Sequence, residues 1–194
     1  MPSDDRTLVY LGLGAAAVAG GVAAAVVALR PKIRNRSRVL LIGDSLAVGM
    51  SPHFDALSKQ LGNKFSSLAR SGSRIDQWAS DTNLDSRLAT FRPDVVLVSL
   101  GTNDEYLGSG AGQRQYASTV ALLQKLKAAG AEVYWIGPPK LTKHNGVVEM
   151  IQSLVPKSDY FDSRQLEIPR GPDGLHPTAR GYAAWAGAVW QWLT

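Results

Sequence analysis

Cysteine is absent from this chain of 194 residues. Its absence excludes disulfide bonds, zinc sites built on thiolates and a cysteine nucleophile, and it leaves the redox environment of the protein unreadable. Hydrophobic residues nevertheless make up 45% of the chain, which is enough for a globular core. The composition is therefore that of a folded protein rather than a disordered one.

The chain after residue 38 also lacks a large excess of positive or negative charge. The net charge is +5, but residues 1–38 hold six of the 21 Lys+Arg and two of the 16 Asp+Glu. The remainder carries 15 basic against 14 acidic residues. Because no basic run interleaved with aromatic residues follows residue 38, we expect no nucleic-acid partner.

The longest uncharged run covers residues 8–29, "LVYLGLGAAAVAGGVAAAVVAL", with no charge in 22 residues. As a helix it would measure about 33 Å, which is enough to cross a hydrocarbon core of about 30 Å. We therefore expect a single transmembrane helix over 8–29 after a tail of residues 1–7. A cleaved signal peptide and a buried alanine-rich helix are the alternatives, but the acidic start "MPSDDR" and the length of the run favour an anchor.

Small residues recur every four positions within this run, at Gly12, Ala16 and Gly20. On a helix they form a ridge along one face that lets a second helix approach closely. Self-association or docking in the membrane through this face is one hypothesis. The other is that an Ala/Gly-rich helix produces such a ridge by chance.

The chain from residue 39 onward alternates short apolar runs with helical patterns. The apolar runs are continuous rather than alternating, which is typical of strands buried on both faces. Strict alternation of strand and helix predicts a parallel sheet between two helical layers, over a domain of residues 39–194. The expected strands are residues 39–42, 65–69, 94–100, 132–137 and 159–162; the expected helices are 46–61, 81–88, 113–129, 147–154 and 178–193.

The residues that follow the strands are candidates for a site, because ligands of such sheets bind beyond the carboxyl ends of the strands. Acyl transfer needs a nucleophile, a base, a carboxylate to orient the base, and donors for the oxyanion. Ser45 lies at the corner after the first strand and is the candidate nucleophile. His176 is the candidate base, with Asp173 three residues earlier. Taken singly, Ser45 could instead cap the following helix, and His176 could be a loop histidine.

Donors for an oxyanion could come from three places on the same edge. The backbone N–H groups of Ser45 and Gly72 follow the first and second strands, and the side-chain amide of Asn103 follows the third. Asn103 could also be an ordinary turn residue. The coincidence of all these groups at one edge favours an active site.

These residues carry a resemblance to a known family. "GDSL" at 43–46, the isolated Gly72, "GTND" at 101–104 and "DGLHP" at 173–177 are similar, in order, to the four sequence blocks of the SGNH/GDSL hydrolases. The resemblance implies a three-layer, flavodoxin-like α/β fold and a serine hydrolase without metal or cofactor. It also implies the roles of nucleophile for Ser45, oxyanion donors for Gly72 and Asn103, and acid and base for Asp173 and His176. An α/β-hydrolase fits less well, because Ala47 stands where its G-x-S-x-G elbow has the last glycine.

The expected function is a membrane-anchored esterase that removes acyl groups, such as O-acetyl, from a glycan, a cell-wall polymer or a lipid. An acyltransferase on the same scaffold and a non-catalytic envelope or virion module are the alternatives. The side of the membrane stays open. The linker of residues 30–38 has five basic residues in nine, which favours a cytoplasmic domain, whereas a wall or glycan substrate favours the cell envelope.

Overall fold

The computed structural model describes residues 31–194. The predicted membrane helix over 8–29, with its Gly12/Ala16/Gly20 face, lies outside the described residues. Among the helices of the described part, none is long and apolar enough to cross a membrane. Residues 33–38, which we expected in the linker, are part of the folded unit, since Ile33 is buried and its N–H donates to the carbonyl of Leu193 over 3.0 Å.

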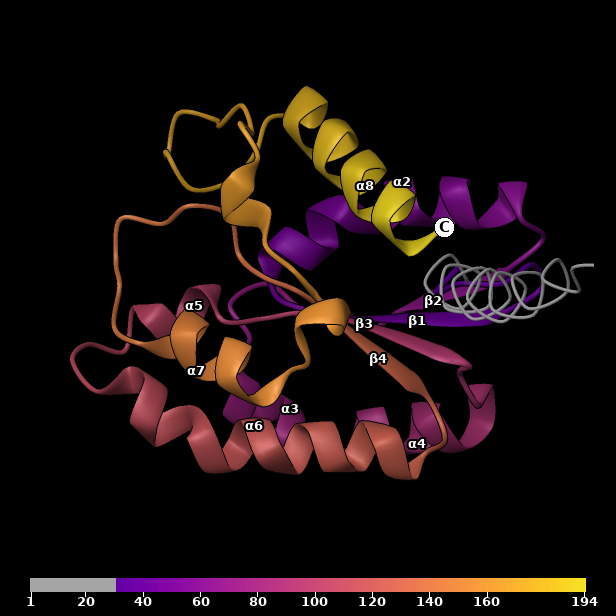
Figure 1. The fold of residues 1–194 in the computed structure, drawn as a ribbon, viewed down its shortest axis with the longest axis horizontal. Helices are drawn as coiled ribbons and strands as arrows, with labels where there is room; N and C mark the ends of the chain where they lie inside the picture. Colours follow the sequence, from indigo (N-terminus) through magenta and orange to yellow (C-terminus); the bar gives the residue numbers. More distant parts are fainter. Residues whose placement is uncertain (1–30) are drawn as a thin grey trace, which may run out of the picture. The chain divides into compact units, whose positions relative to one another are not determined.

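Five strands form one parallel sheet, as the sequence predicts, and the structure shows their order to be β2-β1-β3-β4-β5. The strands are β1 Arg38–Gly43, β2 Lys64–Ser67, β3 Val95–Ser99, β4 Glu132–Ile136 and β5 Tyr160–Phe161. The helices are α2 Ser45–Gln60, α3 Ile75–Ala79, α4 Thr82–Phe91, α5 Thr102–Glu105, α6 Ala111–Ala128, α7 Val147–Leu154 and α8 Ala179–Leu193, with 3₁₀ turns η1 Lys157–Asp159 and η2 Ser163–Gln165. Figure 1 shows α2 and α8 on one face of the sheet and α3, α4, α6 and α7 on the other. The predicted three-layer fold is confirmed.

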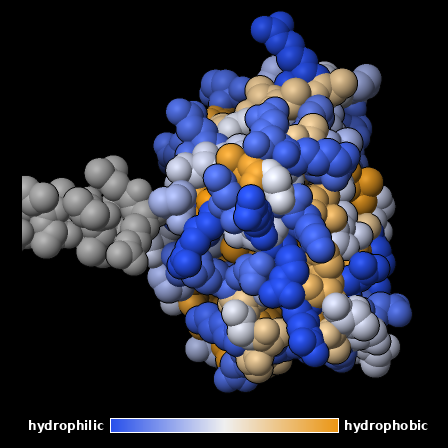
Figure 2. Space-filling model, turned by 90° about the vertical axis from the view of Figure 1, so that its right-hand side faces the viewer, coloured by the Kyte–Doolittle hydropathy of each residue, from blue (hydrophilic) through white to orange (hydrophobic). Residues whose placement is uncertain are grey.

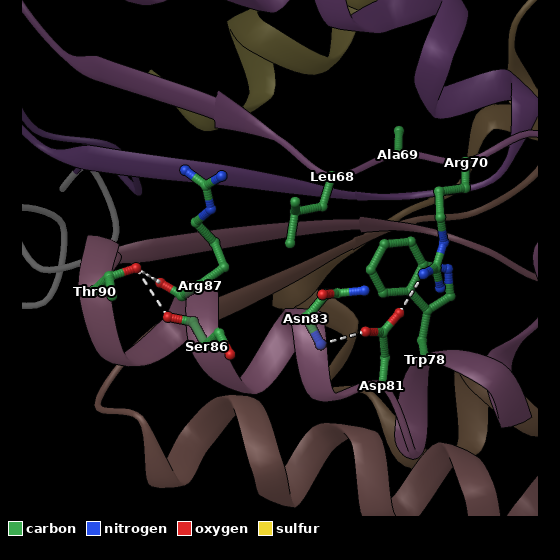
Figure 3. Close-up of a pocket in the computed structure, with 9 residues that line it drawn as sticks. All are labelled: Leu68, Ala69, Arg70, Trp78, Asp81, Asn83, Ser86, Arg87 and Thr90. Carbon is green, nitrogen blue, oxygen red and sulfur yellow. Dashed lines mark hydrogen bonds and ion pairs between the residues drawn. The ribbon is translucent and has the colours of Figure 1, made fainter.

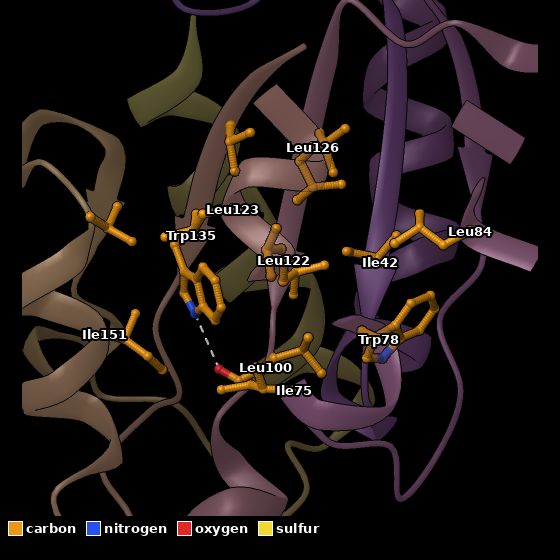
Figure 4. Close-up of a cluster of buried hydrophobic side chains, with 14 of the residues drawn as sticks. Ile42, Ile75, Trp78, Leu84, Leu100, Leu122, Leu123, Leu126, Trp135 and Ile151 are labelled. Carbon is orange, nitrogen blue, oxygen red and sulfur yellow. Dashed lines mark hydrogen bonds between the residues drawn. The ribbon is translucent and has the colours of Figure 1, made fainter. Parts of the chain in front are cut away.

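The hydrophobic core lies on both faces of the sheet. Along β1, Leu40 and Ile42 pack under α3 and α4, whereas Val39 and Leu41 pack under α2 and α8. All four are fully buried, which explains why the strand reads as an unbroken apolar run. Figure 4 shows the first of these clusters, in which the indole N–H of Trp135 donates to the carbonyl of Leu100 over 3.2 Å. Full burial of one aliphatic side chain, such as those of β1, stabilises the fold by roughly 1.5–3 kcal/mol.

Two helices were not predicted, α3 and α5. They contain five and four residues, which is too short for a 3.6-residue hydrophobic period to show. Both lie at the carboxyl edge of the sheet, directly after the segments that contain Gly72 and Gly101.

The opposite edge, where the strands begin, carries mainly hydrophilic side chains with small hydrophobic areas between them (Figure 2).

Candidate active site

The corner between β1 and α2 fixes the position of Ser45. Gly43 is needed there, because a Cβ atom at this position would lie 2.3 Å from the carbonyl oxygen of Ser99 on β3. Asp44 is the N-cap of α2, and its Oδ1 accepts from the N–H of Leu46 over 2.9 Å. The alternative that Ser45 caps the helix is therefore wrong. Ser45 is the first residue of α2, and its hydroxyl is available for another partner.

The structure brings Ser45, His176 and Asp173 together. The Ser45 Oγ lies 2.8 Å from Nε2 of His176, and Nδ1 of His176 lies 2.6 Å from Oδ2 of Asp173. The same carboxylate accepts the N–H groups of Leu175 (3.0 Å) and His176 (2.9 Å) through Oδ1. Asp173 therefore both orients the imidazole and shapes the loop that carries it.

The tautomer of a neutral His176 imidazole follows from these contacts. The hydrogen bond from the His176 side chain, together with the two backbone N–H groups, lowers the pKa of Asp173 to about 2, so its carboxylate is ionised at neutral pH. An ionised acceptor at Nδ1 places the proton of a neutral imidazole on that nitrogen. Nε2 is then a free acceptor for the Ser45 hydroxyl, which is the arrangement that general-base catalysis needs.

Arg170 holds the loop of His176 in place, a role that the sequence did not reveal. The loop closes on itself, because the N–H of Gly171 donates to the carbonyl of His176 over 2.8 Å. The Arg170 guanidinium donates to the carbonyl of Leu175 within the loop and to that of Lys140 over 2.7 Å, in the segment that follows β4. Two neighbouring loops of the site are thereby joined.

The three predicted oxyanion donors lie on the segments that follow β1, β2 and β3. Between described residues, no hydrogen bond uses the N–H of Ser45 or of Gly72. Gly72 has φ +75°, in the left-handed region that favours glycine. The side-chain Nδ2 of Asn103 donates to the carbonyl of Ser73 over 3.0 Å, which occupies one of its two hydrogens and leaves the other.

Ser73 ties these segments to one another. Its hydroxyl lies 3.0 Å from the carbonyl of Gly43 and 2.8 Å from that of Arg70, and it accepts the indole N–H of Trp78 over 2.9 Å. Its own carbonyl is the acceptor for Asn103. One buried serine thus links the nucleophile corner, the Gly72 loop and the Asn103 segment, although a single serine carries no motif in the sequence.

Two fully buried carboxyl groups lie under the site. Burial raises the pKa of Asp44 to about 6, and burial together with the charges of Asp76 and Asp44 raises that of Asp104 to about 7. Oδ1 of Asp104 accepts the N–H of Ile75 at the start of α3 over 3.1 Å. Among described residues, neither Oδ2 of Asp44 nor Oδ2 of Asp104 has a hydrogen-bond partner. These acids hold backbone groups around the site rather than reach it.

A third buried acid, Glu105, fixes the segment after β4. Its Oε1 accepts the N–H groups of Val147 (3.1 Å) and Val148 (3.0 Å) at the start of α7. Its Oε2 accepts the N–H of Asn145. The sequence "GTNDE" therefore supplies one residue to the site, Asn103, and two to its support.

The geometry is that of a serine hydrolase: Ser45, His176 and Asp173 form a hydrogen-bonded chain, and the three predicted oxyanion donors lie on loops at the same carboxyl edge of a parallel sheet. The model of the GDSL-like Lipase/Acylhydrolase family matches residues 41–184. The chain therefore belongs to this family of carboxylic ester hydrolases, as the sequence blocks predicted. A search of curated proteins found no match.

Solved structures of esterases share the fold. An acetyl xylan esterase, AlAXEase, aligns with a TM-score of 0.65 and 18% identity, over 81% of this chain and 100% of its own. The psychrotrophic esterase EstA from Pseudoalteromonas sp. aligns with a TM-score of 0.63 and 20% identity, over 80% of this chain and 95% of its own. An acetyl xylan esterase from Geobacillus stearothermophilus aligns with a TM-score of 0.59 and 15% identity, over 84% and 96%.

Proposed function

We propose that this protein hydrolyses acyl esters through an acyl-enzyme on Ser45. The observation that carries the proposal is the 2.8 Å separation of Ser45 Oγ from His176 Nε2. Ser45 Oγ attacks the ester carbonyl carbon while its proton passes to His176, and the imidazolium then gives that proton to the departing alcohol oxygen. Water then attacks the acyl-enzyme while His176 takes its proton, and the imidazolium gives that proton to Ser45 Oγ as the bond to the acyl group breaks, which releases the acid and restores both residues.

The negative charge on the carbonyl oxygen would be met by three groups: the N–H of Ser45, the N–H of Gly72 and the free amide hydrogen of Asn103. The amino end of α2 adds a favourable dipole, because Ser45 is its first residue. Removing one such donor typically costs about 2.7–4 kcal/mol of transition-state stabilisation. The oxyanion groups thus account for a large share of the expected rate.

We propose O-acetyl esters of a glycan, a cell-wall polymer or a lipid as substrates, with the enzyme held at a membrane by residues 8–29. Two of the structural neighbours are acetyl xylan esterases, which supports a small acyl group and a glycan. The uncharged run of 22 residues supports the anchor. Membrane fractionation of the full chain and of a variant lacking 8–29 tests the anchor: only the full chain should sediment with membranes and resist extraction by high salt.

An ester panel tests the reaction and the substrate class together. It should run from p-nitrophenyl acetate through long-chain p-nitrophenyl esters to acetylated glycans, with Ser45→Ala as the inactive control. Acetyl esters should be cleaved fastest. Release of acid that is unchanged when acceptor alcohols are added supports hydrolysis, whereas a new ester product would identify an acyltransferase.

A further inference from the structure

A cavity of about 570 Å³ lies beside the Gly72 loop, between the sheet edge at β2 and helix α4. Figure 3 shows Trp78, Arg70 and Asp81 at one end of the cavity and Arg87 at the other, with Asn83 between them. The wall combines apolar surface, from Leu68, Ala69 and Trp78, with polar side chains of α4. Neither Ser45 nor His176 lines it, so the cavity is separate from the triad.

A second cavity of about 530 Å³ adjoins this space and is lined by Gly72, one of the three proposed oxyanion donors. Its lining includes Ser71, Gly72 and Ser73, and it shares Arg70 and Asp81 with the first cavity. We call these two neighbouring cavities, whose walls share the Arg70–Asp81 ion pair, the groove; Gly72 lines one of them and Arg87 the other. An ester bound at Ser45 could extend one of its two ends into this groove.

The charges in the groove do not cancel. Arg70 lies 4.2 Å above the ring of Trp78 and forms an ion pair with Asp81. Oδ1 of Asp81 is already occupied at the start of α4, where it accepts the N–H groups of Asn83 (2.7 Å) and Leu84 (3.1 Å). The guanidinium of Arg87 extends into the cavity and has no hydrogen bond or ion pair with any described residue. Two arginines thus face one carboxylate, and one positive charge is left over.

This combination indicates the chemistry of a ligand. A sugar needs amides, hydroxyls and carboxylates for its hydroxyl groups and apolar surface for the C–H face of its ring, and the lining supplies both. A guanidinium matches a carboxylate with two parallel hydrogen bonds. We propose that the groove binds the alcohol part of the ester, an acidic glycan, and that Arg87 pairs with a carboxylate of one of its sugars. This inference rests on the proposed esterase function and adds the substrate class to it.

Binding of a sugar without an ester tests the groove independently of catalysis. The full chain in detergent would be titrated by calorimetry at low salt with the trisaccharide of galacturonic acid and with the neutral galactose trisaccharide. We expect the acidic sugar to bind at least five-fold more tightly than the neutral one. Arg87→Gln should remove that preference, and Arg87→Lys, which keeps the charge, should retain part of it.

The control removes a positive charge elsewhere: Lys127→Gln, an exposed residue of α6, should bind like the wild type. Three results would each contradict the proposal that the groove binds an acidic glycan. They are equal affinity for the two trisaccharides, no binding of either, and an Arg87→Gln variant that keeps the wild-type preference for the acidic one. The trisaccharide carries no ester, so its binding does not depend on catalysis. A protein that binds it but cleaves no ester would refute only the proposed esterase function. A protein that cleaves esters but does not bind it would refute only the proposed glycan site.

Discussion

His176 and Ser45 are 131 positions apart in the chain, yet the imidazole Nε2 lies 2.8 Å from the serine Oγ. The parallel sheet accounts for this contact. Ser45 follows the carboxyl end of β1, near the centre of the sheet, and the loop of His176 returns to the same edge after β5, where Arg170 joins it to the segment after β4. The geometry of the pair is thus a property of the whole fold.

Asp173→Asn should inactivate the enzyme without unfolding it. The asparagine can keep its oxygen toward the N–H groups of Leu175 and His176, but its NH₂ then faces Nδ1 of the imidazole. That contact favours the tautomer with the proton on Nε2, which can no longer accept from Ser45. We expect kcat to fall by about 10²–10⁴-fold with a nearly unchanged melting temperature. A rate within three-fold of the wild type would contradict the role of Asp173.

Ser73→Ala should affect both stability and turnover. The substitution leaves the buried indole N–H of Trp78 without its acceptor, which costs about 1–3 kcal/mol. It also loosens the link between Gly43 and the Gly72 loop, so we expect kcat to fall by about 10- to 100-fold with little change in KM. Ser153→Ala is the control, because that hydroxyl also donates to a backbone carbonyl, in α7, remote from the triad. Equal kinetics for the two variants would show that Ser73 has no positioning role.

A comparison of Gly72→Ala with Gly130→Ala separates the effect of backbone strain on stability from an effect on catalysis. Both glycines have left-handed φ, +75° and +80°, and a Cβ atom at either position would meet nothing within 4 Å. Each variant should therefore lose a similar stability, about 1–2 kcal/mol. Only Gly72→Ala should lower kcat, because of the two glycines only Gly72 has a backbone N–H that we propose as an oxyanion donor. Urea denaturation and steady-state kinetics measure the two effects.

Asp104 predicts how stability depends on pH. Its pKa in the folded protein, about 7, lies above the ordinary value of 3.8, so the folded state binds this proton more tightly than the unfolded state does. The resulting stabilisation is complete below about pH 4 and is lost as the pH rises through about 7. We expect the free energy of unfolding to fall on the order of 2–4 kcal/mol across this window from this group.

Asp104→Asn should weaken that pH dependence and leave the part that comes from Asp44, since the amide is neutral throughout and can still accept from Ile75. Asp55→Asn on α2 is the control; it removes an exposed carboxylate whose partner is Lys59 and should keep the wild-type profile. Urea midpoints between pH 5 and pH 8 provide the measurement. Parallel profiles for the wild type and Asp104→Asn would contradict the assignment.

The sequence predicts much of the fold and the members of the site, because both follow from local patterns. Unbroken apolar runs identify the strands, and the rule that ligands bind beyond strand ends brings Ser45, Gly72 and Asn103 to one edge. The helix over Val147–Leu154 matches its predicted bounds, because its apolar residues repeat clearly. The nucleophile corner could not be settled in this way, since Asp44 and Ser45 are both good caps and only the structure shows which one accepts from Leu46.

The support of the site could not be predicted, for a related reason. Ser73, Glu105 and Arg170 act through contacts with residues 30 to 43 positions away or through backbone carbonyls, and such contacts leave no periodicity and no motif. Helices α3 and α5, which start beside these residues, are equally invisible because of their length. Long-range hydrogen bonding is the part of this protein that its sequence conceals.

The most direct test of the account is labelling by a fluorophosphonate probe combined with hydrolysis of p-nitrophenyl acetate by the full chain. We predict one labelled serine, Ser45, identified by peptide mass spectrometry, and a fall in kcat of about 10³-fold or more in Ser45→Ala. The same rate in Ser45→Ala as in the wild type, or labelling at another serine of the folded protein, would contradict the central claim.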